Sequence, residues 1–215
     1  MKFLLIKFSA FCFGLSLLST LFAVTPESDQ RTCAAVLVED FESYASTEEL
    51  AKIWYNVQHG GTMHQSLEPM IKRSGKYGLK CAYLTTRSAD KFYAPICRVS
   101  KWDLTGCNAI RFWLTPDGSA RELTFQLNIA NAEGKNIHDL WEYTIHPMKG
   151  DTSGQMIIVP FSELAHNIKY ADAPDVSPVF KPESVIEVAL YIGGIHDEPG
   201  EGIYYFDDLT GIRTN

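Results

Sequence analysis

The sequence lacks the short motifs that mark common enzyme classes. It contains no nucleophile elbow, no H-E-x-x-H zinc motif, no phosphate-binding glycine loop and no Cys–His pattern of a thiol enzyme. Its histidines do not cluster with its cysteines, and the cysteines after residue 23 form no C-x-x-C pair, so a zinc site is not expected. These absences favour binding over catalysis.

Basic residues are also scarce. The chain has 19 Lys and Arg against 26 Asp and Glu, a formal net charge of −7, and the basic residues form no stripe. Nucleic-acid binding depends on Lys and Arg at phosphates, so nucleic acid is not an expected partner. The same acidity argues against an anionic membrane surface.

Long apolar runs are limited to one, near residue 1. Two lysines lead an apolar stretch that ends in L-F-A and is followed by polar residues. This pattern predicts a secretory signal peptide over residues 1–23, cleaved after Ala23, and a secreted or periplasmic protein with no membrane attachment after cleavage. A membrane anchor is the alternative, because the run is near spanning length. Loss of Lys2 and Lys7 would change the formal charge from −7 to −9.

Cysteine is scarce but even in number after the signal peptide. An even number of cysteines in an exported protein predicts disulfides. Two disulfides, with three possible connectivities, and one disulfide with two free buried thiols are both compatible with the sequence. The four cysteines are Cys33, Cys81, Cys97 and Cys107.

The clearest structural signal lies in residues 121–164, which predict three successive strands. In the first strand apolar and polar side chains alternate with a period of two, which places them on opposite faces of a half-solvated antiparallel sheet. Amides and aromatic rings on an open face suit a polyhydroxylated ligand, although a merely hydrated sheet surface would show the same pattern. The apolar set is Leu123, Phe125, Leu127 and Ile129, and the polar set is Thr124, Gln126 and Asn128.

The remaining strand signals predict one domain over residues 36–215, after a polar lead-in at 24–35. About eight to ten short strands with regular turn signals, and one short helix near 46–52, predict an all-β fold, an antiparallel β-sandwich. Pro95 suits an edge or bulged strand. The long loop over 167–182 is of the kind that is usually functional or mobile.

Four motifs follow one another along the chain with regular spacing. They are V-E-D-F-E at 38–42, R-S-G-K-Y-G-L-K at 73–80, W-E-Y-T-I-H-P at 141–147 with I-I-V-P-F-S-E-L at 157–164, and Y-Y-F-D-D-L at 204–209. Together they resemble carbohydrate-binding module family eleven, a galactose-binding-like jelly roll, over roughly residues 36–212. The complex I intermediate-associated proteins, a sister family, share much of this pattern.

The resemblance implies a jelly roll whose concave sheet face binds a β-glucan-like polysaccharide without catalysis. The alternative is a protein-interaction or assembly factor on the same fold, as in the sister family. A glycan-active hydrolase is a third interpretation, since Glu142 and Glu187 both fall on a sheet face and a glycosidase needs two carboxylates.

The candidate sugar-binding residues come from strand parity and from the resemblance. Tyr191 lies on the less apolar face of its strand, and Tyr170 lies in the long loop. The resemblance places an aromatic at Phe92 or Tyr93 and another at Trp54 or Tyr55, whereas Asn167 and Lys169 stand where the family has an arginine and an acid. Trp141 and Tyr143 are expected in the core. The predicted carbohydrate-binding residues are Phe92, Tyr93, Gln126, Asn128, Tyr170 and Tyr191.

Carboxylates gather in the first and last predicted strands, which pair in jelly rolls of this type. Clustered carboxylates repel one another unless a cation intervenes, and hard oxygen ligands suit Ca²⁺. We therefore expect Asp40, Glu42 and Asp207 to hold a structural Ca²⁺, which the resemblance also implies. Solvated acids with strand-end hydrogen bonds are the alternative.

Overall fold

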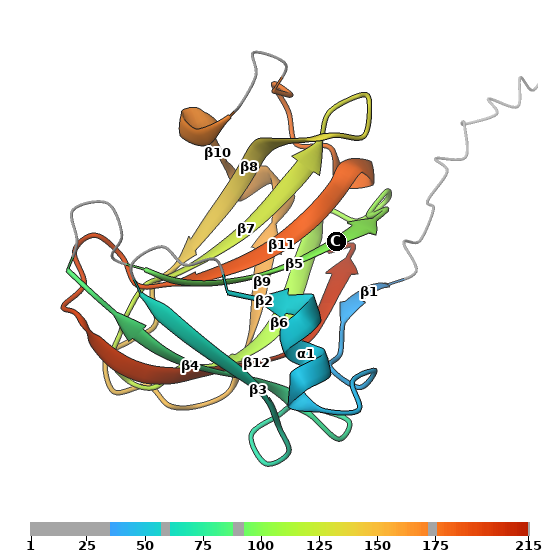
Figure 1. The fold of residues 1–215 in the computed structure, drawn as a ribbon. Helices are drawn as coiled ribbons and strands as arrows, with labels where there is room; N and C mark the ends of the chain where they lie inside the picture. The colour runs from blue at the N-terminus through green and yellow to red at the C-terminus, as the bar shows by residue number, and fades with distance from the viewer. Residues whose placement is uncertain (1–34, 57–60, 88–92, 172–175, 215) are drawn as a thin grey trace, which may run out of the picture. The chain divides into compact units, whose positions relative to one another are not determined.

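The computed structural model describes residues 35–56, 61–87, 93–171 and 176–214, which form two six-stranded antiparallel sheets (Figure 1). Sheet A has the order β3–β4–β12–β6–β9, with β1 also paired to β12, and sheet B has the order β10–β8–β7–β11–β5–β2. The strands of sheet A are β1 (Val36–Glu39), β3 (Thr62–Glu68), β4 (Gly78–Thr85), β6 (Ala109–Thr115), β9 (Gln155–Pro160) and β12 (Gly200–Ile212). Those of sheet B are β2 (Trp54–Tyr55), β5 (Ala94–Trp102), β7 (Leu123–Ala130), β8 (Asn136–Ile145), β10 (Ala165–Asn167) and β11 (Val185–Ile192).

The hydrophobic core lies between the two sheets. Phe112 of β6 stacks on Phe125 of β7 with ring centroids 5.4 Å apart, and both side chains are fully buried. Leu127 and Leu190 of sheet B and Phe206 of sheet A belong to the same buried cluster. Side chains of alternate parity on the two sheets therefore build one interior, as expected for a sandwich. The predicted β-sandwich is confirmed.

One short helix, α1 (Thr47–Ile53), matches the predicted helix at 46–52. The Ser46 side chain accepts a hydrogen bond from the Glu49 amide at 3.3 Å and so caps the helix, and acidic residues occupy its first turn. The other helical segments are the 3-10 turns η1 (Phe161–Glu163), η2 (Ile168–Tyr170) and η3 (Pro182–Ser184). Among the described residues no helix is both long and apolar enough to cross a membrane. The predicted signal peptide lies outside these residues.

The strand predictions differ from the structure mainly in connectivity. Of the three strands expected within 121–164, β7 and β8 pair in sheet B, but β9 crosses to sheet A and pairs with β6. Pro95 lies in β5 opposite Tyr191 of β11. Among the described residues, the other partner of β5 is the two-residue edge strand β2, which pairs with Arg98 and Cys97, so Pro95 lies near the edge of the sheet, as predicted.

The cysteines do not form the two-disulfide framework. Cys81 and Cys97 are buried free thiols, so at most one disulfide is possible in this chain without rearrangement. Cys107 is buried as well, and Cys33 lies outside the described residues. The two free buried thiols of the alternative interpretation are found, and its one disulfide stays a prediction.

A buried carboxylate joins the two sheets. Glu39 ends β1 in sheet A and is 3% exposed. It accepts hydrogen bonds from the Tyr44 hydroxyl at 2.6 Å and the Trp54 indole at 3.0 Å, and it forms an ion pair with Arg98 of β5 in sheet B. The guanidinium of Arg98 also lies over the ring of Trp102. A charge held this deeply is stable only because its partners satisfy it.

We expect Glu39→Ala to lower the free energy of unfolding by about 3 kcal/mol, because the partly buried Arg98 loses its charge partner and the buried Trp54 indole loses its acceptor. Urea unfolding followed by tryptophan fluorescence measures the change. Glu163→Ala, at an exposed site in η1, should change stability by less than about 0.5 kcal/mol. Equal losses in the two variants would contradict this role of Glu39.

Candidate functional site

The strand register places a polar, aromatic-bearing surface on the side of sheet B that faces away from the core. One residue from each strand lines up in a row across this outer face, and neighbouring strands are about 4.8 Å apart, so the row is about 24 Å long. Because alternate residues of β7 fill the core, the residues of this row must point outward. The row consists of Tyr55, Cys97, Ala189, Gln126, Glu142 and Ala165, from β2, β5, β11, β7, β8 and β10.

A hydrogen-bond chain links four strands across this face. The Tyr191 hydroxyl donates to Gln126 Oε1 at 3.2 Å, and Gln126 Nε2 donates to Glu142 Oε1 at 2.7 Å. Asn167 Nδ2 of β10 donates to the same Glu142 oxygen at 2.8 Å. These bonds fix the orientation of each group before a ligand arrives, which reduces the ordering cost of binding.

A second pair of polar residues, Asn128 and Glu187, lies two residues from the row along β7 and β11. Asn128 is 1% exposed, and its Nδ2 donates to Asn136 Oδ1 at 3.0 Å, while its own Oδ1 has no hydrogen-bond partner among the described residues. Glu187 is opposite Asn128 in the register. Burial raises the pKa of the Glu187 carboxyl, although the charge of His138 and a hydrogen bond from Asn128 act in the opposite direction.

Tyrosine rings stand at three places on or beside the face. Tyr93 meets Tyr191 edge to face, with ring centroids 5.2 Å apart. Tyr170 in η2 is 52% exposed, and the Lys169 ammonium lies 5.2 Å from its ring centroid. Tyr55 on β2 is 38% exposed. Exposed rings at both edges and a ring pair nearer the middle can stack against the apolar faces of a ligand.

A buried carboxylate beneath the face holds the segment that carries Tyr170. Asp139 of β8, 1% exposed, accepts from the Trp141 indole at 2.9 Å, contacts His166 Nε2 at 2.8 Å and accepts from the Ser177 amide at 2.7 Å. The His166 ring also stacks on Trp141 at 4.2 Å. This anchor fixes β10, and with it the start of η2, against β8.

The structure groups most of the predicted sugar-binding residues. Tyr93, Gln126, Asn128 and Tyr191 belong to this face, Tyr170 stands at its β10 edge, and Phe92 lies outside the described residues. Trp141 and Tyr143 pack on the core side, as expected.

Sequence reasoning left some members of the face out of the predicted set. Tyr55 is the counterpart of the early aromatic, since Trp54 is fully buried. Glu142 and Asn167 were missed as binding residues. The core positions of Trp141 and Tyr143 imply that Glu142, between them, points outward; only the pairing of β10 with β8 reveals Asn167.

The thiol of this face is not poised for catalysis. Burial raises the pKa of the Cys97 thiol to about 12, so this thiol stays protonated and is a poor nucleophile. Glu142 and Glu187, the two carboxylates that the hydrolase interpretation would use, are two strands and two residues apart, a Cα separation of roughly 12 Å from strand spacing and rise.

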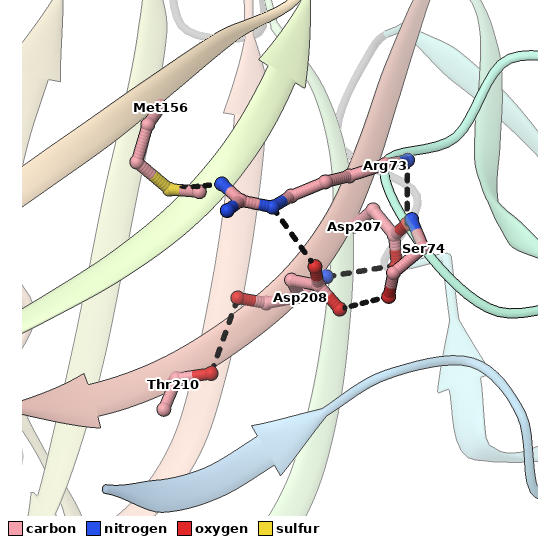
Figure 2. A network of polar contacts seen from close by, with 6 residues as sticks. All are labelled: Arg73, Ser74, Met156, Asp207, Asp208 and Thr210. Carbon is pink, nitrogen blue, oxygen red and sulfur yellow. Dashed lines mark hydrogen bonds and ion pairs between the residues drawn. The ribbon is translucent and has the colours of Figure 1, made fainter.

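The predicted calcium ligands are engaged by backbone amides instead of by one another. Asp207 Oδ2 accepts from the amides of Arg73 and Ser74, at 2.8 and 3.0 Å, and Glu42 Oε1 accepts from the amides of residues 76 and 77, at 2.6 and 2.9 Å. Both acids therefore hold the turn between β3 and β4. Figure 2 shows the side chain of Arg73 extending from this turn to Asp208 and Met156.

Glycine is required in this turn. Gly75 has φ +59°, and a Cβ there would lie 2.1 Å from Glu42 Oε1. Asp40 makes a separate contact, in which its Oδ1 accepts from the Glu42 amide at 3.1 Å. Within the described residues no group of three or more His, Cys, Asp or Glu could hold a metal ion, so Asp40, Glu42 and Asp207 are not brought into one site. Calcium stays a prediction of the resemblance, which a fall in melting temperature on addition of a chelator would support.

The fold and this face define a class of protein: a β-sandwich module that binds glycans without cleaving them. The comparison with protein families agrees, because the family described as carbohydrate binding domain (family 11) matches residues 23–191. The chain belongs to carbohydrate-binding family 11, and its function is non-catalytic polysaccharide binding.

Solved structures show the same fold. The family 11 module of the cellulosomal cellulase Lic26A-Cel5E of Clostridium thermocellum is 17% identical, with 84% of this chain and 95% of that chain covered and a TM-score of 0.64. The family 11 module from Clostridium thermocellum in complex with a β-1,3-1,4-mixed-linked tetrasaccharide is 18% identical, with 84% and 96% covered and a TM-score of 0.63. The family 30 module of the cellulosomal cellulase Cel9D-Cel44B of Clostridium thermocellum is 13% identical, with 85% of this chain and 99% of that chain covered and a TM-score of 0.56. No curated protein matches the sequence.

We expect Asp207→Ala to destabilise the fold by about 3 kcal/mol, because three backbone amides, of Arg73, Ser74 and Asp208, lose their acceptor. Thermal unfolding measured by circular dichroism tests this. Asp208→Asn is the matched control, since it tolerates the positive φ of that position and removes a partly exposed ion pair of less than about 1 kcal/mol. A loss no larger than that of the control would show that the amide contacts of Asp207 are dispensable.

Proposed function

We propose that the outer face of sheet B binds a β-glucan chain. The observation that carries this proposal is the row across six strands, whose central residues Gln126 and Glu142 are hydrogen-bonded to each other. Tyr191 and Asn167, beside the row, donate to these two residues and hold them in place. The family 11 module solved with a β-1,3-1,4-mixed-linked tetrasaccharide supports a glucan as the ligand. The predicted signal peptide supports action outside the cell, as a secreted or periplasmic protein.

Rings and polar groups would act on different parts of a sugar. Tyr55 and Tyr170, which stand at opposite edges, would stack on the C–H faces of sugar rings. Gln126 and Glu142 lie between these two rings and would exchange hydrogen bonds with hydroxyls. The length of the row, about 24 Å, suits a chain rather than a single sugar.

The affinity should be modest. Each stacked ring contributes on the order of 1 kcal/mol beyond area burial, by analogy with aromatic pairs. Two or three rings with a few hydrogen bonds correspond to dissociation constants of roughly micromolar to millimolar. Such a module would concentrate a protein on a polysaccharide without holding it permanently.

Tyr55→Ala and Tyr170→Ala should each weaken binding to mixed-linked β-1,3-1,4-glucan about tenfold, because each removes one stacking surface. Isothermal titration calorimetry of the protein lacking residues 1–23 measures the dissociation constants. Tyr205→Ala is the matched control: Tyr205 lies between the core residues Tyr204 and Phe206, so it points away from the core on the outer face of sheet A.

Two results would contradict the proposal. Unchanged affinity in both edge variants, with a loss in Tyr205→Ala, would move the site to sheet A. Absence of binding by the wild-type protein across a panel of neutral glucans would favour a protein partner for this face.

A further inference from the structure

The outer face of sheet B carries two carboxylates between its tyrosines. Glu142 is opposite Gln126, and Glu187 is opposite Asn128, so both carboxylates share the outward side of the sheet with these amides. Each is partly buried. A partly desolvated negative charge interacts more strongly with a second charge than one in bulk water does.

Only one of the two oxygens of the Glu142 carboxylate accepts hydrogen bonds from described residues. One oxygen, Oε1, accepts from the amides of both Gln126 and Asn167. No described residue donates a hydrogen bond to the other oxygen, Oε2. An ionised carboxylate can only accept, so Oε2 requires a donor from water or from a ligand.

A second acceptor without a donor lies beside Glu187. Asn128 Oδ1 is buried and has no partner among the described residues, and the Asn128 side chain contacts the Glu187 carboxylate. A buried acceptor without a donor costs free energy until a donor reaches it.

Cationic residues stand beside the face. Lys169 lies beside Tyr170 at the β10 edge. Lys101 lies two residues beyond the exposed Val99 on β5, where the register shifts. The charge of His138 acts on Glu187 and lowers the pKa of its carboxyl.

We propose that Glu142 and Glu187 are specificity-determining residues that restrict the glucan-binding face to uncharged sugars. This inference rests on the proposed function. Glu142 Oε2 accepts a hydrogen bond from a sugar hydroxyl, and the charges of both residues repel uronate or sulfate groups on an otherwise suitable chain. Discrimination by an unpaired like charge is a common way of rejecting a wrong partner.

The test compares two polymers with the same backbone: neutral hydroxyethylcellulose and anionic carboxymethylcellulose, titrated by calorimetry at low ionic strength. The wild-type protein should bind the anionic polymer at least about tenfold more weakly. In the double variant Glu142→Gln/Glu187→Gln this ratio should fall below about threefold, since glutamine keeps the acceptor oxygen and removes the charge.

The control variant Glu163→Gln/Glu201→Gln removes the same two charges from exposed sites outside this face, in η1 and at the end of β12, and should leave the ratio unchanged. If the double variant does not fold, the wild-type ratio measured against salt decides, because a charge-based ratio must shrink as screening increases.

Equal wild-type affinities for the two polymers would overturn the inference and leave glucan binding intact. A ratio that survives in the double variant, collapses equally in the control or does not respond to salt would also overturn it. If the wild-type protein binds neither these polymers nor any other neutral glucan, the proposed function fails and the inference fails with it.

Discussion

The period-two alternation of β7 is the constraint on which the rest of the structure depends. This strand pairs with β8 without a shift from Leu123 to Ile129, and with β11 without a shift from Leu123 to Asn128. A slip of one residue would send Phe125 to solvent and Gln126 into the core. The same pairing therefore builds the hydrophobic interior and presents the polar row, so folding and binding are specified by one set of contacts.

Buried carboxylates connect parts of the fold that backbone hydrogen bonds between strands do not join. Glu39 joins the sheets through Arg98, Asp139 fixes β10 under the face, and Asp207 holds the turn after β3. Each of these acids is less than 4% exposed and is satisfied by several donors. Polar groups that are fully satisfied in this way rigidify a fold, and the rigid scaffold is what keeps the outer face of sheet B ordered without a ligand.

Much of the fold could be predicted from the sequence because its information is local. Alternation predicted which side chains of β7 fill the core and which face outward, and the short helix predicted near 46–52 is α1. The crossing of β9 into sheet A could not be predicted, since nothing within that strand specifies its partner. For the site, Gln126 and Tyr191 followed from parity, whereas Asn167 depends on a three-residue strand, β10, that has no periodic signal of its own. Hydrogen bonds of Glu42 and Asp207 were one of the two interpretations of these acids, but the sequence does not identify the backbone amides that donate to them.

The binding of a glucan chain to the outer face of sheet B is the proposal on which the functional conclusions depend. The most direct measurement is backbone amide NMR during titration with a mixed-linked β-1,3-1,4-glucan tetrasaccharide. If the glucan binds there, we expect saturable chemical-shift changes at Tyr55, Gln126 and Glu142, which lie along the row. We expect none at Ala82 and Ile203, on the outer face of sheet A. Shifts confined to sheet A, or none at saturating ligand, would contradict it.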